Sequence, residues 1–146
     1  MNGYYNMDSS DSFDESGWLK TGDVVYYDDD CCFYVVDRIK ESFKYRGWFV
    51  APALIENELL NHPAVKQAVV VGIPHEDGYH PMGLVVTRDG FDVSEQDLEK
   101  FVEERVPERQ RLRAGVKFVK DLPLTVTGKV KRSEIKQMIS EGSKNA

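Results

Sequence analysis

An apolar run at residues 65–74, VKQAVVVGIP, sets the architecture that the rest of the chain has to satisfy. The run is long enough to form a buried strand. A second strand, MGLVVTRDG at residues 82–90, follows after the short polar stretch HEDGYHP, which the sequence predicts to be a loop. Strands joined in this way, without a regular alternation with helices, favour an α+β domain.

The other elements follow from local signals. The sequence VVYYDDDCCFYVVD at residues 24–37 predicts a hairpin around an acidic turn. Pro52 opens a helix that Pro63 ends, and Ser94 caps a second helix in which Asp97 completes a capping box. An apolar stripe along that second helix consists of Leu98, Phe101, Val102 and Val106. Further along we expect a strand at residues 115–123, a polar loop at residues 124–131 and a final helix at residues 132–141. The sequence thus predicts a small mixed sheet flanked by about three helices and preceded by a two-stranded hairpin.

Two segments give weaker signals. Residues 1–16 are rich in Ser, Asp and Asn and predict a loop or a frayed end. Residues 38–47, RIKESFKYRG, have the length of a short helix, but Gly47 and the neighbouring aromatic residues favour a shaped loop.

Composition excludes several classes of protein. A chain of 146 residues suits one globular unit, and its net charge of −6 argues against a general nucleic-acid binder. No apolar stretch approaches the length of a membrane span, and the first residues do not form a signal peptide. The last residues, SEGSKNA, are not a peroxisomal address, so we expect a cytoplasmic location and leave a peroxisomal one open for a longer form of the protein.

The cysteines and histidines give no clear metal site in the sequence. Cys31 and Cys32 are adjacent, so a disulfide between them is not expected and reduced thiols are favoured. His75 and His80 flank Asp77, which is a pattern for a metal ligand set or a general base. Because no fourth ligand lies at a suitable spacing, a polar loop without metal is the favoured interpretation.

Three segments carry residues suited to phosphate or sugar chemistry. The Asp23 carboxylate, after Thr21 and Gly22, can accept hydrogen bonds from the vicinal hydroxyls of a ribose, although a simple turn fits as well. A basic stretch from Arg38 to Trp48 suits a polyanion or a solvated loop. Lys129 follows Thr-Gly but lacks the second glycine and the Ser or Thr of a P-loop, so it is a single point charge in a loop.

Taken together and in order, these segments resemble a known family. GYYN, GWLKTGD, YVVDRIKE, KYRGWFVAPALIE, HPAVKQAVVVGIP and DLPLTVTGKVKR are similar to the C-terminal part of adenylate-forming enzymes, which include acyl-CoA synthetases, 4-coumarate-CoA ligases and beetle luciferases. The resemblance covers nearly the whole chain. It implies a ligase that joins a carboxylic acid to ATP, releasing pyrophosphate, and then transfers the acyl group from AMP to a thiol. In that family the small C-terminal domain rotates between the two steps.

The resemblance also implies roles for single residues. Asp23 and Arg38 match nucleotide-binding positions, Lys40 matches the hinge, and Lys129 matches the catalytic lysine of adenylation.

A second group of residues matches the face used after adenylation. Lys44 matches the lysine presented in the second conformation, and Gly47 matches a glycine beside the path of coenzyme A, with Tyr45, Arg46 and Trp48 around it. The implied substrates of the full-length enzyme are ATP with Mg²⁺, coenzyme A and a small carboxylic acid, and no cofactor is expected to be bound tightly by this chain. No metal site is implied.

The sequence departs from the family pattern at several places, of which Phe49 is the most important because relatives often carry Gln or Arg there. The family's phosphate loop and acyl pocket belong to a large N-terminal domain, and nothing here resembles them. We therefore expect residues 1–37 to be the tail end of that domain with the hairpin leading to the hinge, and residues 38–146 to be the mobile C-terminal domain, inactive alone. A luciferase-type enzyme domain and a non-catalytic nucleotide- or CoA-binding module are the alternatives.

Overall fold

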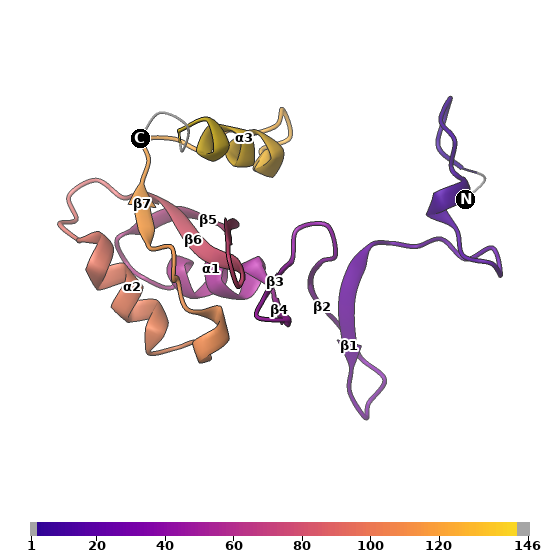
Figure 1. Ribbon diagram of the computed structural model, residues 1–146, viewed down its shortest axis with the longest axis horizontal. Helices are drawn as coiled ribbons and strands as arrows, with labels where there is room; N and C mark the ends of the chain where they lie inside the picture. Colours follow the sequence, from indigo (N-terminus) through magenta and orange to yellow (C-terminus); the bar gives the residue numbers. More distant parts are fainter. Residues whose placement is uncertain (1–2, 143–146) are drawn as a thin grey trace. The chain divides into compact units, whose positions relative to one another are not determined.

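The computed structural model describes residues 3–142 and divides the chain into two compact units, with the boundary between Lys40 and Glu41 (Figure 1). The length alone suits one globular unit. The hairpin in the first unit, however, leaves most of its side chains exposed, whereas the second unit has the buried cores. The two units are therefore described separately.

The first unit is built on an antiparallel hairpin. Strand β1 (Asp23–Tyr27) pairs with β2 (Phe33–Arg38), which confirms the hairpin expected at residues 24–37. The acidic turn is closed by Asp28, whose carboxylate accepts hydrogen bonds from the Cys32 amide at 3.0 Å and the Tyr34 hydroxyl at 2.8 Å. Cys31 and Cys32 are exposed free thiols. A short 3₁₀ helix, η1 (Ser10–Ser12), precedes the hairpin.

The second unit is built on a mixed five-stranded sheet. Its strand order is β4 (Trp48–Val50), β3 (Phe43–Tyr45), β6 (Gly78–Thr87) and β5 (Val65–His75), and β7 (Val116–Phe118) also pairs with β6. The pairing of β6 with β7 is parallel and the other pairings are antiparallel. The mixed sheet predicted from the sequence is therefore confirmed.

Helices cover both faces of this sheet. Helix α1 (Pro52–Leu60) begins at its proline, and α2 (Glu95–Glu103) begins at the capping box in which the Ser94 and Asp97 side chains each accept from the other residue's amide. Helix α3 (Arg132–Gly142) ends the described chain, and η2 (Glu108–Gln110) is a 3₁₀ turn. Within residues 3–142, no helix combines the length and the apolar content that crossing a membrane requires.

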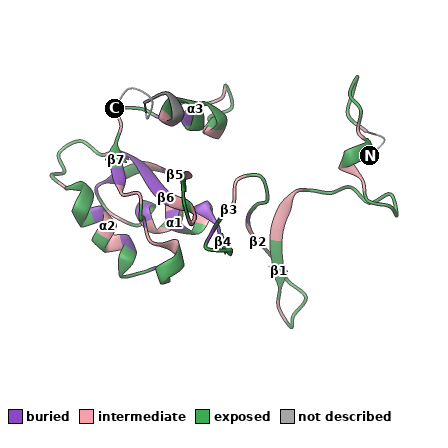
Figure 2. Ribbon diagram, in the orientation of Figure 1, coloured by how far each residue is buried: buried purple, intermediate pink, exposed green. Residues whose placement is uncertain are grey.

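The core consists of two clusters, because β5 and β6 bury side chains on both faces. Val70 and Val85 pack with residues of α1 and α2, such as Leu59 and Leu98. Their neighbours along the strands belong to the second cluster, with Ile135 of α3. Figure 2 shows the buried residues concentrated in these strands and in the helix faces next to them. Each fully buried Val, Leu or Ile contributes about 1.5–3 kcal/mol, so these clusters hold the second unit together.

Two local expectations are wrong. The polar stretch at residues 75–81 is mostly strand, since β6 already begins at Gly78 and only Glu76 and Asp77 form the turn. Residues 38–47 do not form a loop throughout, because β3 and β4 make a second hairpin there. Both hairpins meet where Tyr45 pairs with Gly78, and a Cβ at Gly78 would lie 2.7 Å from the Lys44 carbonyl oxygen. The tight approach of two backbones, which the sequence does not reveal, fixes both strands.

Candidate functional site

The predicted nucleotide-binding residues of the first unit face each other at the open end of its hairpin. Asp23 is the first residue of β1 and pairs in register with Arg38, the last residue of β2. Nε of Arg38 lies 3.2 Å from Oδ1 of Asp23. The Asp23 side chain is 26% exposed and that of Arg38 is 65% exposed. An exposed ion pair of this kind contributes at most about 1 kcal/mol to stability, so it adds little to the stability of the hairpin.

The backbone around this pair is shaped by Gly22. Its φ of +76° is in the left-handed region, where glycine is tolerated without strain. The Gly22 carbonyl accepts a hydrogen bond of 2.8 Å from the Ile39 amide, which closes the end of the hairpin beyond the ion pair. The Asp23 carboxylate is a strong acceptor that can bind vicinal hydroxyls.

Lys40, the predicted hinge residue, is exposed and is the last residue of the first unit. Residues 39–41 form a turn. The described chain therefore changes from one compact unit to the other directly after this lysine.

Lys44 lies exposed in the middle of β3, opposite Phe49 of β4. The turn between the strands consists of Arg46 and Gly47, with φ values of +46° and +80°. Two consecutive positive φ values are the signature of a type I′ turn, whose twist matches that of a hairpin. Glycine suits such a turn, but arginine is strained there by about 1–2 kcal/mol.

Asp77, in the turn between β5 and β6, holds Arg46 in this conformation. The Arg46 amide donates to the Asp77 carbonyl at 3.0 Å, and Nε of Arg46 donates to Oδ2 of Asp77 at 2.8 Å. This guanidinium holds the pKa of the Asp77 carboxyl far below its usual range, and hydrogen bonds from His80 and His75 act in the same direction. Asp77 is therefore a carboxylate at any physiological pH and anchors the hairpin that carries Lys44.

Aromatic and basic side chains surround the same hairpin. Tyr45 is buried, whereas its cross-strand partner Trp48 is 60% exposed. The guanidinium of Arg109 lies 5.1 Å from the centre of the Trp48 ring, and that of Arg113 lies 4.9 Å from the centre of the Tyr45 ring. No sequence motif indicates a role for these two arginines, and their only signal is the basic run ERQRLR at residues 108–113. The fold brings that run next to the predicted coenzyme A segment.

Lys129 lies in a loop that is closed by its own hydrogen bonds. The Thr125 amide donates to the Lys129 carbonyl at 2.7 Å, and the Lys129 amide donates to the Thr125 hydroxyl at 3.0 Å. The Gly128 amide donates to the Thr125 carbonyl at 2.9 Å, with Gly128 at φ +81°. The Lys129 side chain is exposed. The loop is thus a preformed turn that presents one positive charge to solvent.

The two candidate catalytic lysines are not brought together within the second unit. Figure 1 shows the loop that leads into α3, which contains Lys129, well separated from the β3–β4 hairpin, which contains Lys44. The structure does group Lys44, Tyr45, Arg46, Gly47 and Trp48 in one hairpin. One unit therefore has two separate surfaces, each with an exposed lysine.

The histidine pair forms a compact group at the tip of the β5–β6 hairpin. Oδ1 of Asp77 accepts hydrogen bonds from Nδ1 of His75 at 2.8 Å and from Nε2 of His80 at 2.7 Å. The two imidazole rings stack with centres 4.0 Å apart. The sequence favoured a polar loop here, and the early start of β6 instead turns these three side chains toward one point.

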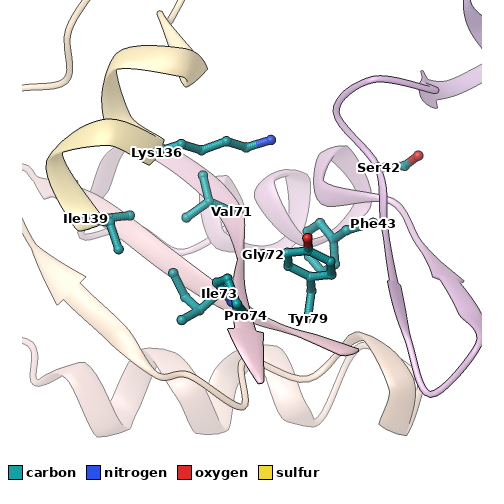
Figure 3. A pocket seen from close by; sticks show the side chains of 9 residues that line it. All are labelled: Ser42, Phe43, Val71, Gly72, Ile73, Pro74, Tyr79, Lys136 and Ile139. Atoms are coloured by element: carbon teal, nitrogen blue, oxygen red, sulfur yellow. The ribbon is translucent and has the colours of Figure 1, made fainter. Parts of the chain in front are cut away.

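A pocket of about 540 Å³ opens in the second unit beside α3 (Figure 3). Its wall is mostly apolar, and Lys136 of α3 adds one ammonium group to it. The residues that line it are Ser42, Phe43, Val71, Gly72, Ile73, Pro74, Tyr79, Lys136 and Ile139. None of the site residues predicted from the sequence is among them.

Comparisons with known proteins agree on one family. Residues 54–129 match the model of the AMP-binding enzyme C-terminal domain. The chain is 42% identical over 144 residues to luciferin 4-monooxygenase of Photuris pensylvanica, an alignment that covers 97% of this chain and 26% of that protein. It is 39% identical over 147 residues to peroxisomal OPC-8:0-CoA ligase 1 of Arabidopsis thaliana, covering 99% of this chain and 27% of that protein.

A solved structure gives the same result for the fold. O-succinylbenzoate coenzyme A synthetase (MenE) of Bacillus subtilis, in complex with AMP, is similar with a TM-score of 0.83 and 33% identity, over 93% of this chain and 28% of that one. The chain therefore spans about a quarter of the length of these relatives. The family match covers more than half of the chain, and the predicted α+β fold agrees with it. The chain belongs to the family of AMP-binding enzyme C-terminal domains found in adenylate-forming enzymes such as CoA ligases and luciferases.

Proposed function

We propose that this chain is the mobile C-terminal domain of an ATP-dependent carboxylic acid–CoA ligase, which forms an acyl-adenylate and then a thioester. One observation carries the proposal: two exposed lysines lie on separate elements of one unit, Lys129 in the loop before α3 and Lys44 on β3. A domain that presents one surface and then the other to a shared active site needs this separation.

In the first half-reaction, a substrate carboxylate attacks the α-phosphate of ATP, and pyrophosphate leaves. Negative charge accumulates between the carboxylate and the phosphate in the transition state. The compact ammonium group of Lys129 stabilises that charge. The preformed loop reduces the conformational entropy that is lost when Lys129 is oriented, because the amide and the carbonyl of Lys129 are already hydrogen-bonded to Thr125.

In the second half-reaction, the thiol of coenzyme A attacks the acyl carbonyl and loses its proton to solvent. The acyl carbon–oxygen bond to AMP then breaks, and AMP leaves with the bonding electron pair. The β3–β4 hairpin supports this step, with Lys44 at the centre and Gly47 allowing close approach of the pantetheine chain. Arg46, Arg109 and Arg113 gather near Tyr45 and Trp48. Guanidinium groups suit the phosphates of coenzyme A, and the exposed Trp48 ring suits its adenine.

The first unit contributes the ribose contact through Asp23, with Arg38 beside it, and Lys40 acts as the hinge. The partner of this unit is the large N-terminal domain of the same enzyme. The exposed aromatic side chains of the hairpin support that partner, since Tyr26, Tyr27 and Phe33 are more than half exposed. An isolated two-stranded hairpin is marginal in water, so a larger surface is needed to cover it.

A luciferase-type domain, which adenylates luciferin and then assists its oxidation, is a second candidate. It is favoured by the 42% identity to a luciferin 4-monooxygenase. The test joins the chain to a large N-terminal domain of this family and adds luciferin and ATP. Light emission would identify the luciferase activity. If the joined protein is active as a ligase but emits no light, the luciferase activity is excluded.

The test of the ligase proposal is pyrophosphate release from ATP with a panel of fatty and aromatic acids. The chain is assayed alone and together with the large domain of a related ligase, with Lys129→Ala as the variant. Lys131→Ala is the matched control, because Lys131 is a nearby lysine that pairs with Glu134. We expect activity only in the mixture. It should be lost in Lys129→Ala and kept in Lys131→Ala. Saturable ATP or coenzyme A binding without any turnover would instead support a non-catalytic binding module.

A further inference from the structure

The tip of the β5–β6 hairpin places three ligand-type side chains at one point. His75 ends β5 and lies opposite Gly78, while His80 lies opposite Ile73. His75 and Ile73 are two residues apart and share a face of the strand, so His75 and His80 lie on the same face. Gly78 has no side chain between them, which lets the two imidazole rings stack. The placement of the two histidines follows from the strand register, and Asp77 lies in the two-residue turn between β5 and β6.

Hydrogen bonds now join the three side chains, with N–H hydrogens in the places where a metal ion would lie. A carboxylate can only accept, so Nδ1 of His75 and Nε2 of His80 each donate to the same oxygen, Oδ1 of Asp77. The three ligand atoms lie within 4.8 Å of one another. Around a tetrahedral ion with bonds of about 2.0–2.2 Å, neighbouring ligand atoms lie about 3.3–3.6 Å apart. Each histidine nitrogen therefore needs to move away from Oδ1 of Asp77 by about 0.5–0.9 Å to admit an ion.

From this geometry we propose that His75, Asp77 and His80 bind a divalent transition-metal ion of the zinc class. Each neutral imidazole moves its N–H hydrogen to the other ring nitrogen, so its lone pair and the Asp77 carboxylate take the ion without any net loss of protons. Two imidazoles and one carboxylate form a three-ligand set that zinc and similar ions prefer, whereas Mg²⁺ and Ca²⁺ prefer oxygen ligands. A water molecule completes the coordination.

The surroundings of the three side chains fix their orientation. Nε of Arg46 donates to Oδ2 of Asp77, which orients the carboxylate and leaves Oδ1 toward the histidines. The His80 ring packs edge-on against buried Tyr45, with ring centres 5.4 Å apart. Such supporting contacts orient metal ligands in proteins. The positive charge of Arg46 opposes a cation, so we expect weaker binding than at a structural site with four protein ligands.

The site also lies next to the hairpin that carries Lys44, because Arg46 and Tyr45 belong to that hairpin. The metal proposal does not depend on the ligase proposal, since it rests only on the ligand geometry. The two can therefore fail independently.

The test is calorimetric titration of ZnCl₂ into the 146-residue chain carrying Cys31→Ser and Cys32→Ser, because exposed thiols would bind zinc themselves. We expect one ion per chain. His75→Gln and His80→Gln should each lower the affinity for zinc by at least tenfold to hundredfold. This is the effect of removing a residue that only supports a metal ligand, and removing a ligand should cost no less. His62→Gln, a histidine outside the group, is the matched control and should leave the affinity unchanged.

A second measurement makes the result decisive. Imidazole nitrogen NMR signals of His75 and His80 should shift on zinc addition, while those of His62 should not. If His80→Gln fails to fold, His75→Gln decides the test, because the His75 side chain is 54% exposed and its loss leaves the core intact. No saturable zinc binding, binding that survives both His75→Gln and His80→Gln, or equal binding of Mg²⁺ would overturn the proposal.

Discussion

The loop around Lys129 and the hairpin around Lys44 present the same kind of side chain in opposite ways. The Lys129 loop is closed by bonds among Thr125, Gly128 and Lys129, all within five residues. The Lys44 hairpin is held by distant parts of the chain, through Asp77 and the backbone at Gly78. One lysine is therefore on a self-contained turn and the other is on a platform fixed to the core.

This difference shows which local features need the rest of the fold. A self-contained turn keeps its shape while it approaches different partners, as the proposed delivery of Lys129 into an active site in another domain requires. A platform fixed to the core instead transmits any disturbance of its anchor to the position of Lys44. Substitutions at the anchors should separate the two cases.

The largest stability effect is expected for Gly78→Ala. A Cβ there would lie 2.7 Å from the Lys44 carbonyl oxygen, and the φ of +123° is unfavourable for alanine. We expect a loss of about 2–3 kcal/mol in the free energy of unfolding, measured by urea denaturation. Gly128→Ala is the matched control, since nothing lies within 4 Å of its Cβ position, and only the left-handed penalty of about 1 kcal/mol applies. Equal losses in both variants would contradict the contrast between platform and turn.

A smaller effect is expected for Asp77→Asn, which removes the charge that anchors Arg46. The pKa of Asp77 is lowered in the folded state, mainly by Arg46, so its carboxylate stabilises the fold above the ordinary aspartate pKa of about 3.9. That contribution is lost as the pH falls below this value. Thermal unfolding in EDTA should therefore show a lower Tm for the variant at pH 7 and a shrinking difference toward pH 3. Asp92→Asn, at an exposed position, serves as the control, and a difference independent of pH would argue against the ion pair.

The smallest effect is expected for Thr125→Val, which removes the hydroxyl that accepts from the Lys129 amide. Because the loop is self-contained, the free energy of unfolding should change by no more than about 0.5 kcal/mol. Amide hydrogen exchange should accelerate at Lys129 and stay unchanged in β3. Accelerated exchange in both places would mean that the turn and the platform are coupled.

The sequence predicted those parts of the fold that depend on nearby residues. The capping box of Ser94 and Asp97, the proline that opens α1 and the buried strand at residues 65–74 all have signals within a few positions, and each is present. The hairpin of β3 and β4 was missed because three-residue strands have no detectable periodicity. Its turn also lacks the usual Asn-Gly or Asp-Gly sequence. Arg46 adopts a left-handed conformation there because Asp77, 31 positions away, supplies two hydrogen bonds.

The candidate site shows the same limit. Motifs identified Asp23, Arg38, Lys44 and Lys129 as candidates, and the register of β1 and β2 brings the first two within contact distance. Arg109 and Arg113 were not found because their approach to Trp48 and Tyr45 depends on how η2 packs near β4. The group of His75, Asp77 and His80 depends on where β6 starts, which is set by the contact of Gly78 with β3.

In the proposed mechanism, the two lysines serve different half-reactions. The direct test joins this chain to the large domain of a related ligase and measures both steps for Lys129→Ala and Lys44→Ala. Lys129→Ala should slow pyrophosphate release by about a hundredfold to a thousandfold, the cost of removing one group that stabilises developing charge. It should leave thioester formation from a supplied acyl-adenylate unchanged. Lys44→Ala should slow the thioester step and spare pyrophosphate release. If both variants slow the same half-reaction to the same extent, the two surfaces do not alternate and the proposed mechanism is wrong.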